Sequence, residues 1–171
     1  DTERTVKEKI RKWKEDVERV ERRLEELVDR ARKLSKENVD RMRELVRRLE
    51  DRVRKDPDKD KLRKEVERLE RRIEESHREV KELVERIKKE IKELVDELHR
   101  RSEDIKRDLE EKVRVREVLE DARRKIDELN ERVERVAETV RRKLDKILED
   151  NKRVVERVKE EIRRVLEELE R

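Results

Sequence analysis

The sequence predicts an all-α protein, an antiparallel up-down-up three-helix bundle of long, nearly straight helices. Apolar residues recur every three or four positions along most of the 171 residues, which is the period of one buried helix face. The chain has no Gly and a single Pro, so it offers almost no residue suited to tight turns or hairpins. Charged residues make up 63% of the chain, against about 25% in ordinary soluble domains. This high content of charged residues, combined with a regular spacing of the apolar residues, favours amphipathic helices over disorder.

The first predicted helix covers residues 2–55. Its apolar stripe is interrupted by Asn38 and stops before a charged segment around Pro57. An Asp followed by Pro suits a helix start, because Pro has a preset φ and lacks an N–H that would be unpaired there anyway. We therefore place the first turn at Asp56 and the start of the second helix at Pro57. The apolar positions of this stripe are Val6, Ile10, Trp13, Val17, Val20, Leu24, Leu27, Ala31, Leu34, Met42, Leu45, Leu49 and Val53.

The second helix is predicted over residues 57–112 and the third over residues 116–170. The connection between them contains no Gly, Pro, Ser, Asn or Asp, and its local signal is the β-branched alternation Val113-Arg114-Val115, which disfavours helix slightly. Segment length is the stronger argument, because a break at 112–116 yields three segments of nearly equal length, as a closed bundle needs. We expect one domain over residues 1–171 and a monomer. The alternative is a continuous helix through this point, with the bundle closed between two exchanged chains.

A polar layer is predicted inside the bundle. Folding the chain at these turns places Ser76 opposite Ser35 and Asn151, with Asn38 one helical turn from Ser35 and His77 beside the group. A buried polar group without a partner costs about 1–3 kcal/mol, so we expect these side chains to bond to one another. Such a layer opposes slipped pairings and sets the helix register. The alternative is that some of them lie at the stripe edge and bond to water.

No residue pattern indicates catalysis, a cofactor or a metal. The chain has no Cys nucleophile and no Gly-rich loop for phosphate. Glu74 with His77, and Asp96 with His99, have the carboxylate-x-x-His spacing of di-iron helix bundles. The two histidines are separated by about 33 Å of helix and cannot share an ion. We therefore expect no enzyme. His99 faces Trp13 by the same numbering, so we expect it to pack at the edge of the stripe.

No partner is indicated either. The longest uninterrupted apolar run has two residues, so we expect neither a signal peptide nor a membrane span, and a chain soluble in the cytoplasm on recombinant expression. The 56 basic and 52 acidic residues are interleaved, and Trp13 is the single aromatic residue. Nucleic acid binding needs a basic stripe and, for single strands, stacking aromatics. The sequence favours at most weak, salt-dependent attraction to phosphate.

Together these features resemble computationally designed helical bundles. They are the absence of Gly, the near-exclusive use of Glu, Lys, Arg, Asp, Leu, Val and Ile, the Asp56-Pro57 loop, one Trp13 and the polar layer. The second loop, which lacks a cap residue, departs from that style. The resemblance covers the whole chain and implies a very stable scaffold without natural substrate. One alternative is a natural coiled-coil or spectrin-like spacer that binds a partner helix, although such spacers usually keep Gln, aromatic residues and exposed apolar patches. Another is a solvated single helix, which the apolar stripes contradict.

Overall fold

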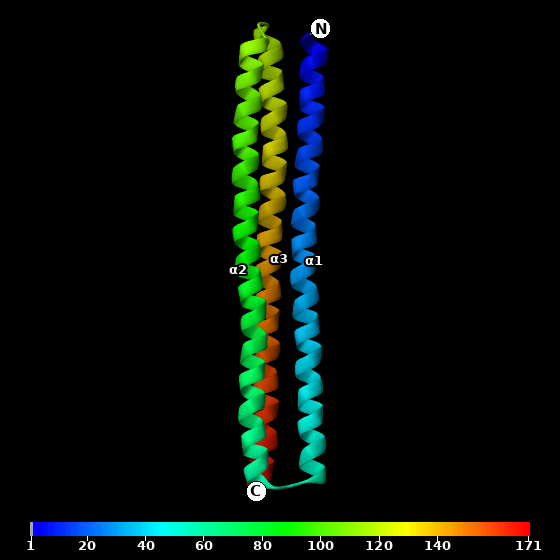
Figure 1. Ribbon diagram of the computed structural model, residues 1–171, viewed down its shortest axis with the longest axis vertical. Coiled ribbons are helices and arrows are strands. Elements are labelled where there is room, and N and C mark those ends of the chain that lie inside the picture. Colours follow the sequence, from blue (N-terminus) through cyan, green and yellow to red (C-terminus); the bar gives the residue numbers. More distant parts are fainter. Residues whose placement is uncertain (1) are drawn as a thin grey trace. The chain divides into compact units, whose positions relative to one another are not determined.

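The computed structural model describes residues 2–171, which form three α-helices and no strand (Figure 1). Helix α1 spans Thr2–Lys55, α2 spans Lys59–Lys112 and α3 spans Arg116–Glu170. These bounds confirm the predicted all-α three-helix bundle. The break between α2 and α3 lies at residues 113–115, so the second and third helices are separate, as segment length predicts.

The three helices contribute to two compact units. The first unit contains the chain up to Val28 together with Arg86–Lys143, and the second contains Asp29–Glu85 together with Leu144–Arg171. Each unit therefore holds one segment of every helix. Within each unit α2 runs antiparallel to α1 and α3, because residues later in α2 contact residues earlier in each of the other two helices.

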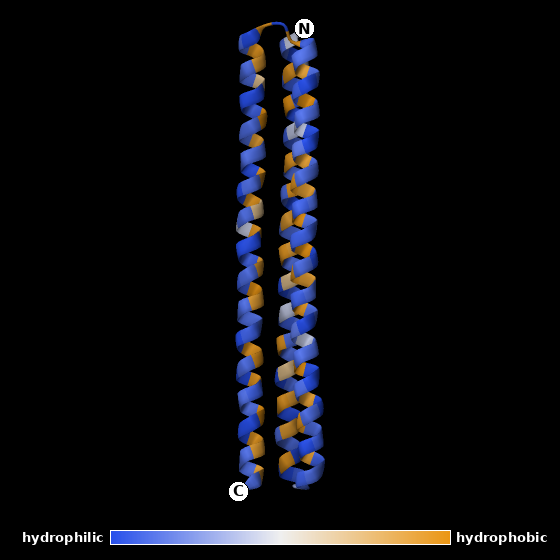
Figure 2. Ribbon diagram, turned by 90° about the vertical axis from the view of Figure 1, so that its left-hand side faces the viewer, coloured by the Kyte–Doolittle hydropathy of each residue, from blue (hydrophilic) through white to orange (hydrophobic). Residues whose placement is uncertain are grey.

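Each unit has its own apolar core, formed by the residues of the stripes. Figure 2 shows hydrophobic residues recurring along each helix between hydrophilic ones. Aliphatic side chains dominate both cores, and Trp13 adds the one aromatic ring of the first. The buried residues of the first core are Val6, Trp13, Val17, Leu98, Leu109, Val113, Ala122, Ile126 and Val133. Those of the second are Met42, Val46, Leu49, Leu62, Val66, Leu69, Ile73, Val155, Val158 and Ile162.

The turn between α1 and α2 corrects the predicted helix start. The backbone N–H of Asp56 still bonds within α1, and a residue that precedes Pro is disfavoured in the α region, so the helix ends there. Asp58 is the N-cap of α2: its Oδ1 accepts hydrogen bonds from the backbone N–H groups of Asp60 and Lys61, at 3.2 and 3.4 Å. Helix α2 therefore begins two residues after Pro57, and the cap residue is Asp58 and not Asp56.

The turn between α2 and α3 has no comparable cap. The carbonyl oxygen of Val115 accepts the first hydrogen bond of α3, from the backbone N–H of Leu119 at 3.1 Å. Val115 thus occupies the N-cap position without a side chain that could accept a hydrogen bond, and it is 57% exposed. Val113, at the other end of the turn, is buried in the core of the first unit. No residue in the described part of the chain has a positive φ, in keeping with a sequence that lacks Gly.

Candidate functional site: the buried polar layers

Asn151 on α3 is the centre of the polar group predicted in the second unit. It is 1% exposed, and its Nδ2 donates to Ser35 Oγ on α1 at 3.1 Å. Its Oδ1 lies 2.9 Å from Nδ1 of His77 on α2, which must be the donor because a carboxamide oxygen only accepts. The amide therefore links all three helices of this unit. Ser35 and His77 are both half-buried, so each also keeps access to water.

Asn38 and Ser76 form a separate contact in the same unit. Asn38 is 0% exposed, and its Nδ2 donates to the backbone carbonyl of Ser76 at 2.9 Å. Ser76 thus takes part through its main chain, whereas the sequence predicts a side-chain partner. Asn38 Oδ1 is the one buried side-chain N or O atom among residues 2–171 that has no hydrogen-bond partner. All five predicted residues lie in one unit, and their hydrogen bonds fall into two groups.

A second polar layer, not predicted from the sequence, lies in the first unit. The indole Nε1–H of Trp13 donates to Asn130 Oδ1 at 3.1 Å, and Asn130 Nδ2 donates to Ser102 Oγ at 2.9 Å. The Ser102 hydroxyl in turn donates to the carbonyl of His99 at 2.9 Å. Trp13, Asn130 and Ser102 are all buried. Every polar side-chain group of this layer is paired, and the layer again joins α1, α2 and α3.

The ring of Trp13 also has a cationic neighbour. The guanidinium carbon of Arg101 lies 5.6 Å from the ring centroid, within the range of a cation–π contact. Asp16 Oδ2 accepts from Arg101 at 2.5 Å and so helps to hold the guanidinium in place. Because Trp13 and Asp16 are on α1 and Arg101 is on α2, this group adds an electrostatic link beside the polar layer.

His99 on α2 makes a polar contact with α3. Its Nε2 lies 2.6 Å from Glu134 Oε1 on α3, and the pair is exposed enough to meet water. Across residues 2–171, no group of three or more His, Cys, Asp or Glu side chains has an arrangement that could hold a metal ion. None of the described helices combines the length and the apolar character needed to cross a membrane.

Ion pairs connect the helices along the edges of each core. Arg132 on α3 makes two close contacts with Glu21 on α1, at 2.6 and 3.0 Å, and these hydrogen bonds raise the pKa of the guanidinium. In the second unit Lys159 donates to Glu74 at 2.7 Å and lowers the pKa of that carboxyl. Such surface pairs contribute little each, typically about 0–1 kcal/mol, and they mainly favour the pairing of particular helix edges.

Comparisons with known proteins include a similarity to a solved structure. No family model matches the chain, and no curated protein matches it. A solved structure described as a computationally designed three helix bundle is similar, with 18% sequence identity and a TM-score of 0.39. The alignment covers 98% of this chain and 83% of that one. The three-helix fold of this chain rests on the helices and contacts given above.

Proposed function

We propose that this protein is a structural scaffold of the computationally designed kind, a single domain and a monomer without natural biochemical activity. Its buried asparagine-centred layers set the register of the helices. The observation that carries the proposal is that the polar groups in both cores serve the bundle itself. Asn151 and Asn130 each bond to two side chains, and in both units the partners lie on the other two helices.

The register role follows from the geometry inside each unit. A helix that slips by one turn moves by about 5.4 Å, which would break bonds that are 2.9–3.1 Å long. A stranded buried amide or indole N–H then costs about 1–3 kcal/mol for each group. Aliphatic side chains discriminate less between registers, because the next apolar residue of the stripe takes the vacated place. The polar layers therefore supply most of the penalty against slipped pairings.

The exposed surface supports a scaffold over a spacer that binds a partner helix. Among residues 2–171, Val115 is the one large hydrophobic side chain that is exposed. It lies in the turn before α3, where a partner helix would find no continuous stripe. Recognition of an amphipathic partner helix uses several apolar anchors in a groove, and the apolar stripes here are already covered by the neighbouring helices of each unit.

The proposal is tested by removing the polar layers together. In this variant Asn38, Asn130 and Asn151 become Leu and Ser35, Ser76 and Ser102 become Ala. A control variant carries Ile126→Leu and Ile162→Leu, which alter both cores without touching a polar group. Light scattering should give one species near 21.4 kDa for the unchanged chain and for the control. Paired spin labels on α1 and α3, read by dipolar spectroscopy, should show one distance distribution for each of these two proteins.

The layer-free variant should show several spin-label distances or a higher mass, because nothing then opposes a slipped or exchanged pairing. A layer-free variant with the same single distance and the same mass as the control would refute the register role. A mass near twice 21.4 kDa for the unchanged chain would refute the monomer.

A further inference from the structure

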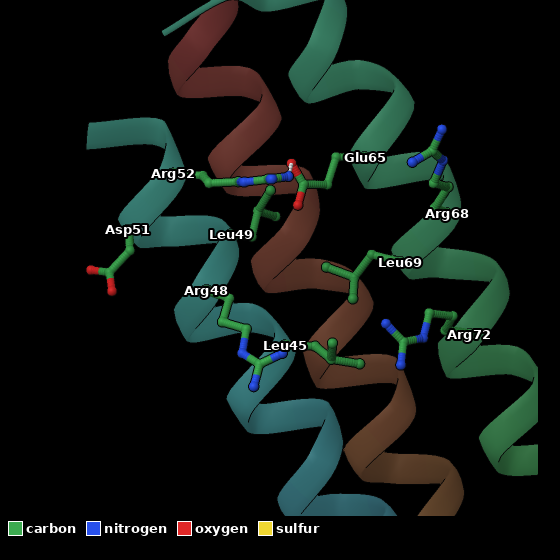
Figure 3. Close-up of a pocket in the computed structure, with 9 residues that line it drawn as sticks. All are labelled: Leu45, Arg48, Leu49, Asp51, Arg52, Glu65, Arg68, Leu69 and Arg72. Carbon is green, nitrogen blue, oxygen red and sulfur yellow. Dashed lines mark ion pairs between the residues drawn. The ribbon is translucent and has the colours of Figure 1, made fainter. Parts of the chain in front are cut away.

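A groove in the second unit lies between α1 and α2, and arginines line much of it. Its volume is about 470 Å³, and Leu45, Leu49 and Leu69 contribute its apolar part. Figure 3 shows the side chains of Arg48 and Arg72 directed toward Leu45 from opposite helices. The ion pair between Arg52 and Glu65, 2.5 Å long, lies farther along the same groove. The remaining lining residues are Asp51 and Arg68.

The charges around Leu45 in this groove differ from those at other α1–α2 contacts. In the first unit, opposite charges meet between these helices, as in Arg23 with Glu90 and Asp16 with Arg101. At Leu45 two guanidinium groups share the groove instead. Arg48 is paired on its own helix, with Glu44 at 3.2 Å. Arg72 has no ion-pair or side-chain hydrogen-bond partner within the part of the chain that the structure describes.

The residues that line this groove carry more positive than negative charge. Four arginines and two carboxylates line it, which leaves a formal charge of +2, since 4 − 2 = 2. Figure 3 shows Asp51 directed away from the groove, so Glu65 is the carboxylate that faces it, and Glu65 is already occupied by Arg52. Guanidinium groups bind phosphate and carboxylate oxygens through paired N–H donors. The leucine side chains beside them exclude part of the water and strengthen that attraction.

We propose that this groove is a binding site for a small phosphate or polyphosphate anion, held between Arg48 and Arg72 and over Leu45. The anion bridges α1 and α2 at Arg72, which has no carboxylate partner of its own among the described residues. Arg52 and Glu65 form an ion pair at one side of the site. The site is separate from the buried polar layers, and it does not depend on the scaffold role.

The test uses inorganic pyrophosphate as the probe and a charge-reversed variant. Arg72→Glu removes one clamp and places a carboxylate opposite Arg48. Arg71→Glu is the matched control, because Arg71 is the adjacent residue of α2, is exposed and does not line the groove. Binding is measured by calorimetric titration at low ionic strength, with sodium chloride at equal ionic strength as the control for general screening. Arg72→Glu should weaken pyrophosphate binding at least about tenfold, and Arg71→Glu should weaken it by less than about threefold.

A second measurement is made without the anion. Arg72→Glu should raise the thermal midpoint of the protein, because the like charges across the groove become an ion pair, while Arg71→Glu should not. Pyrophosphate should raise the midpoint of the unchanged chain and of Arg71→Glu but leave Arg72→Glu unaffected. Equal loss of binding in the two variants, or no binding to the unchanged chain above the chloride control, would overturn the proposal.

Discussion

Replacing each of three buried asparagines by leucine should change the free energy of unfolding in a fixed order. Asn38→Leu should be the most favourable, Asn151→Leu intermediate and Asn130→Leu the least favourable. All three substitutions share the same chemistry. Each gains about 1.5–3 kcal/mol from aliphatic burial, and each risks about 1–3 kcal/mol from overpacking. The differences among them therefore report on the hydrogen-bond partners.

The structure assigns a different loss to each site. Asn38 Oδ1 is unpaired, so its removal recovers about 1–3 kcal/mol. The carbonyl that Asn38 binds also accepts a bond within its own helix, so nothing is stranded. At position 130 the substitution strands the indole N–H of Trp13, which is 0% exposed, at a cost of about 1–3 kcal/mol. The partners of Asn151, Ser35 and His77, are half-buried and can turn to water.

The difference between Asn38→Leu and Asn130→Leu should therefore be about 2–6 kcal/mol, the sum of one recovered and one added penalty. Equilibrium unfolding in guanidinium chloride measures it, because this stronger denaturant also unfolds bundles of high stability. The corresponding alanine variants at the same three positions serve as controls, since they strand the same groups without overpacking. Values that agree within about 0.5 kcal/mol at all three sites, or the reverse order, would show that the partners do not decide the effect.

Three further outcomes are expected. Val115→Asp should stabilise the protein by about 0.5–2 kcal/mol because it supplies a cap for α3, whereas Val115→Ala should be near neutral. Asp58→Ala should lower the free energy of unfolding by about 1 kcal/mol because it removes the cap of α2. Denaturant unfolding measures both effects. Lys159 lowers the pKa of Glu74 from its usual 4.5, chiefly by hydrogen bonding. The folded state therefore binds a proton at Glu74 less readily than the unfolded state does. The contribution of this pair to the stability of the fold is present above pH 4.5 and is lost as the pH falls through the lowered pKa. In a Glu74→Gln variant the thermal midpoint should change less with pH over this range than it does in the unchanged chain. Calorimetric titration with zinc should show no stoichiometric site, and a submicromolar site that disappears in His77→Ala would contradict this.

The helices could be predicted from the sequence because their signal is long and redundant. The stripes repeat over whole helices, and one uncertain position changes nothing in the assignment. The start of α2 rests on few residues. Asp56 and Asp58 are both acceptable caps by residue type, and the choice between them depends on how the chain leaves α1. Asp56 still bonds within that helix, which leaves Asp58 to cap the next one.

The two polar layers differ in how visible they are in the sequence. Asn38 and Asn151 interrupt the predicted stripes at positions where an aliphatic residue is expected. Asn130 is less visible because its neighbour Leu129 fits the period almost as well. Asn130 follows Ile126 by four residues and precedes Val133 by three, which is the spacing of the buried face. That spacing, together with Ser102 on the stripe of α2, is the signal that identifies the layer. Its pairing with Trp13 depends on the register of α1 against α3, which periodicity alone does not determine.

The second turn shows that tertiary burial can replace local turn chemistry. By its own sequence the segment 113–115 is a poor turn, because Val115 provides no cap for α3 and leaves an aliphatic side chain 57% exposed. The missing cap costs about 1 kcal/mol. Val113 is 4% exposed in the core of the first unit, and burying such a side chain contributes about 1.5–3 kcal/mol. The backbone N–H of Val113 still bonds to the Leu109 carbonyl at 2.8 Å, so Val113 extends the stripe of α2 into the turn. The burial term exceeds the cap term, so core packing at Val113 offsets the missing cap, and segment length predicts the turn although no local motif does.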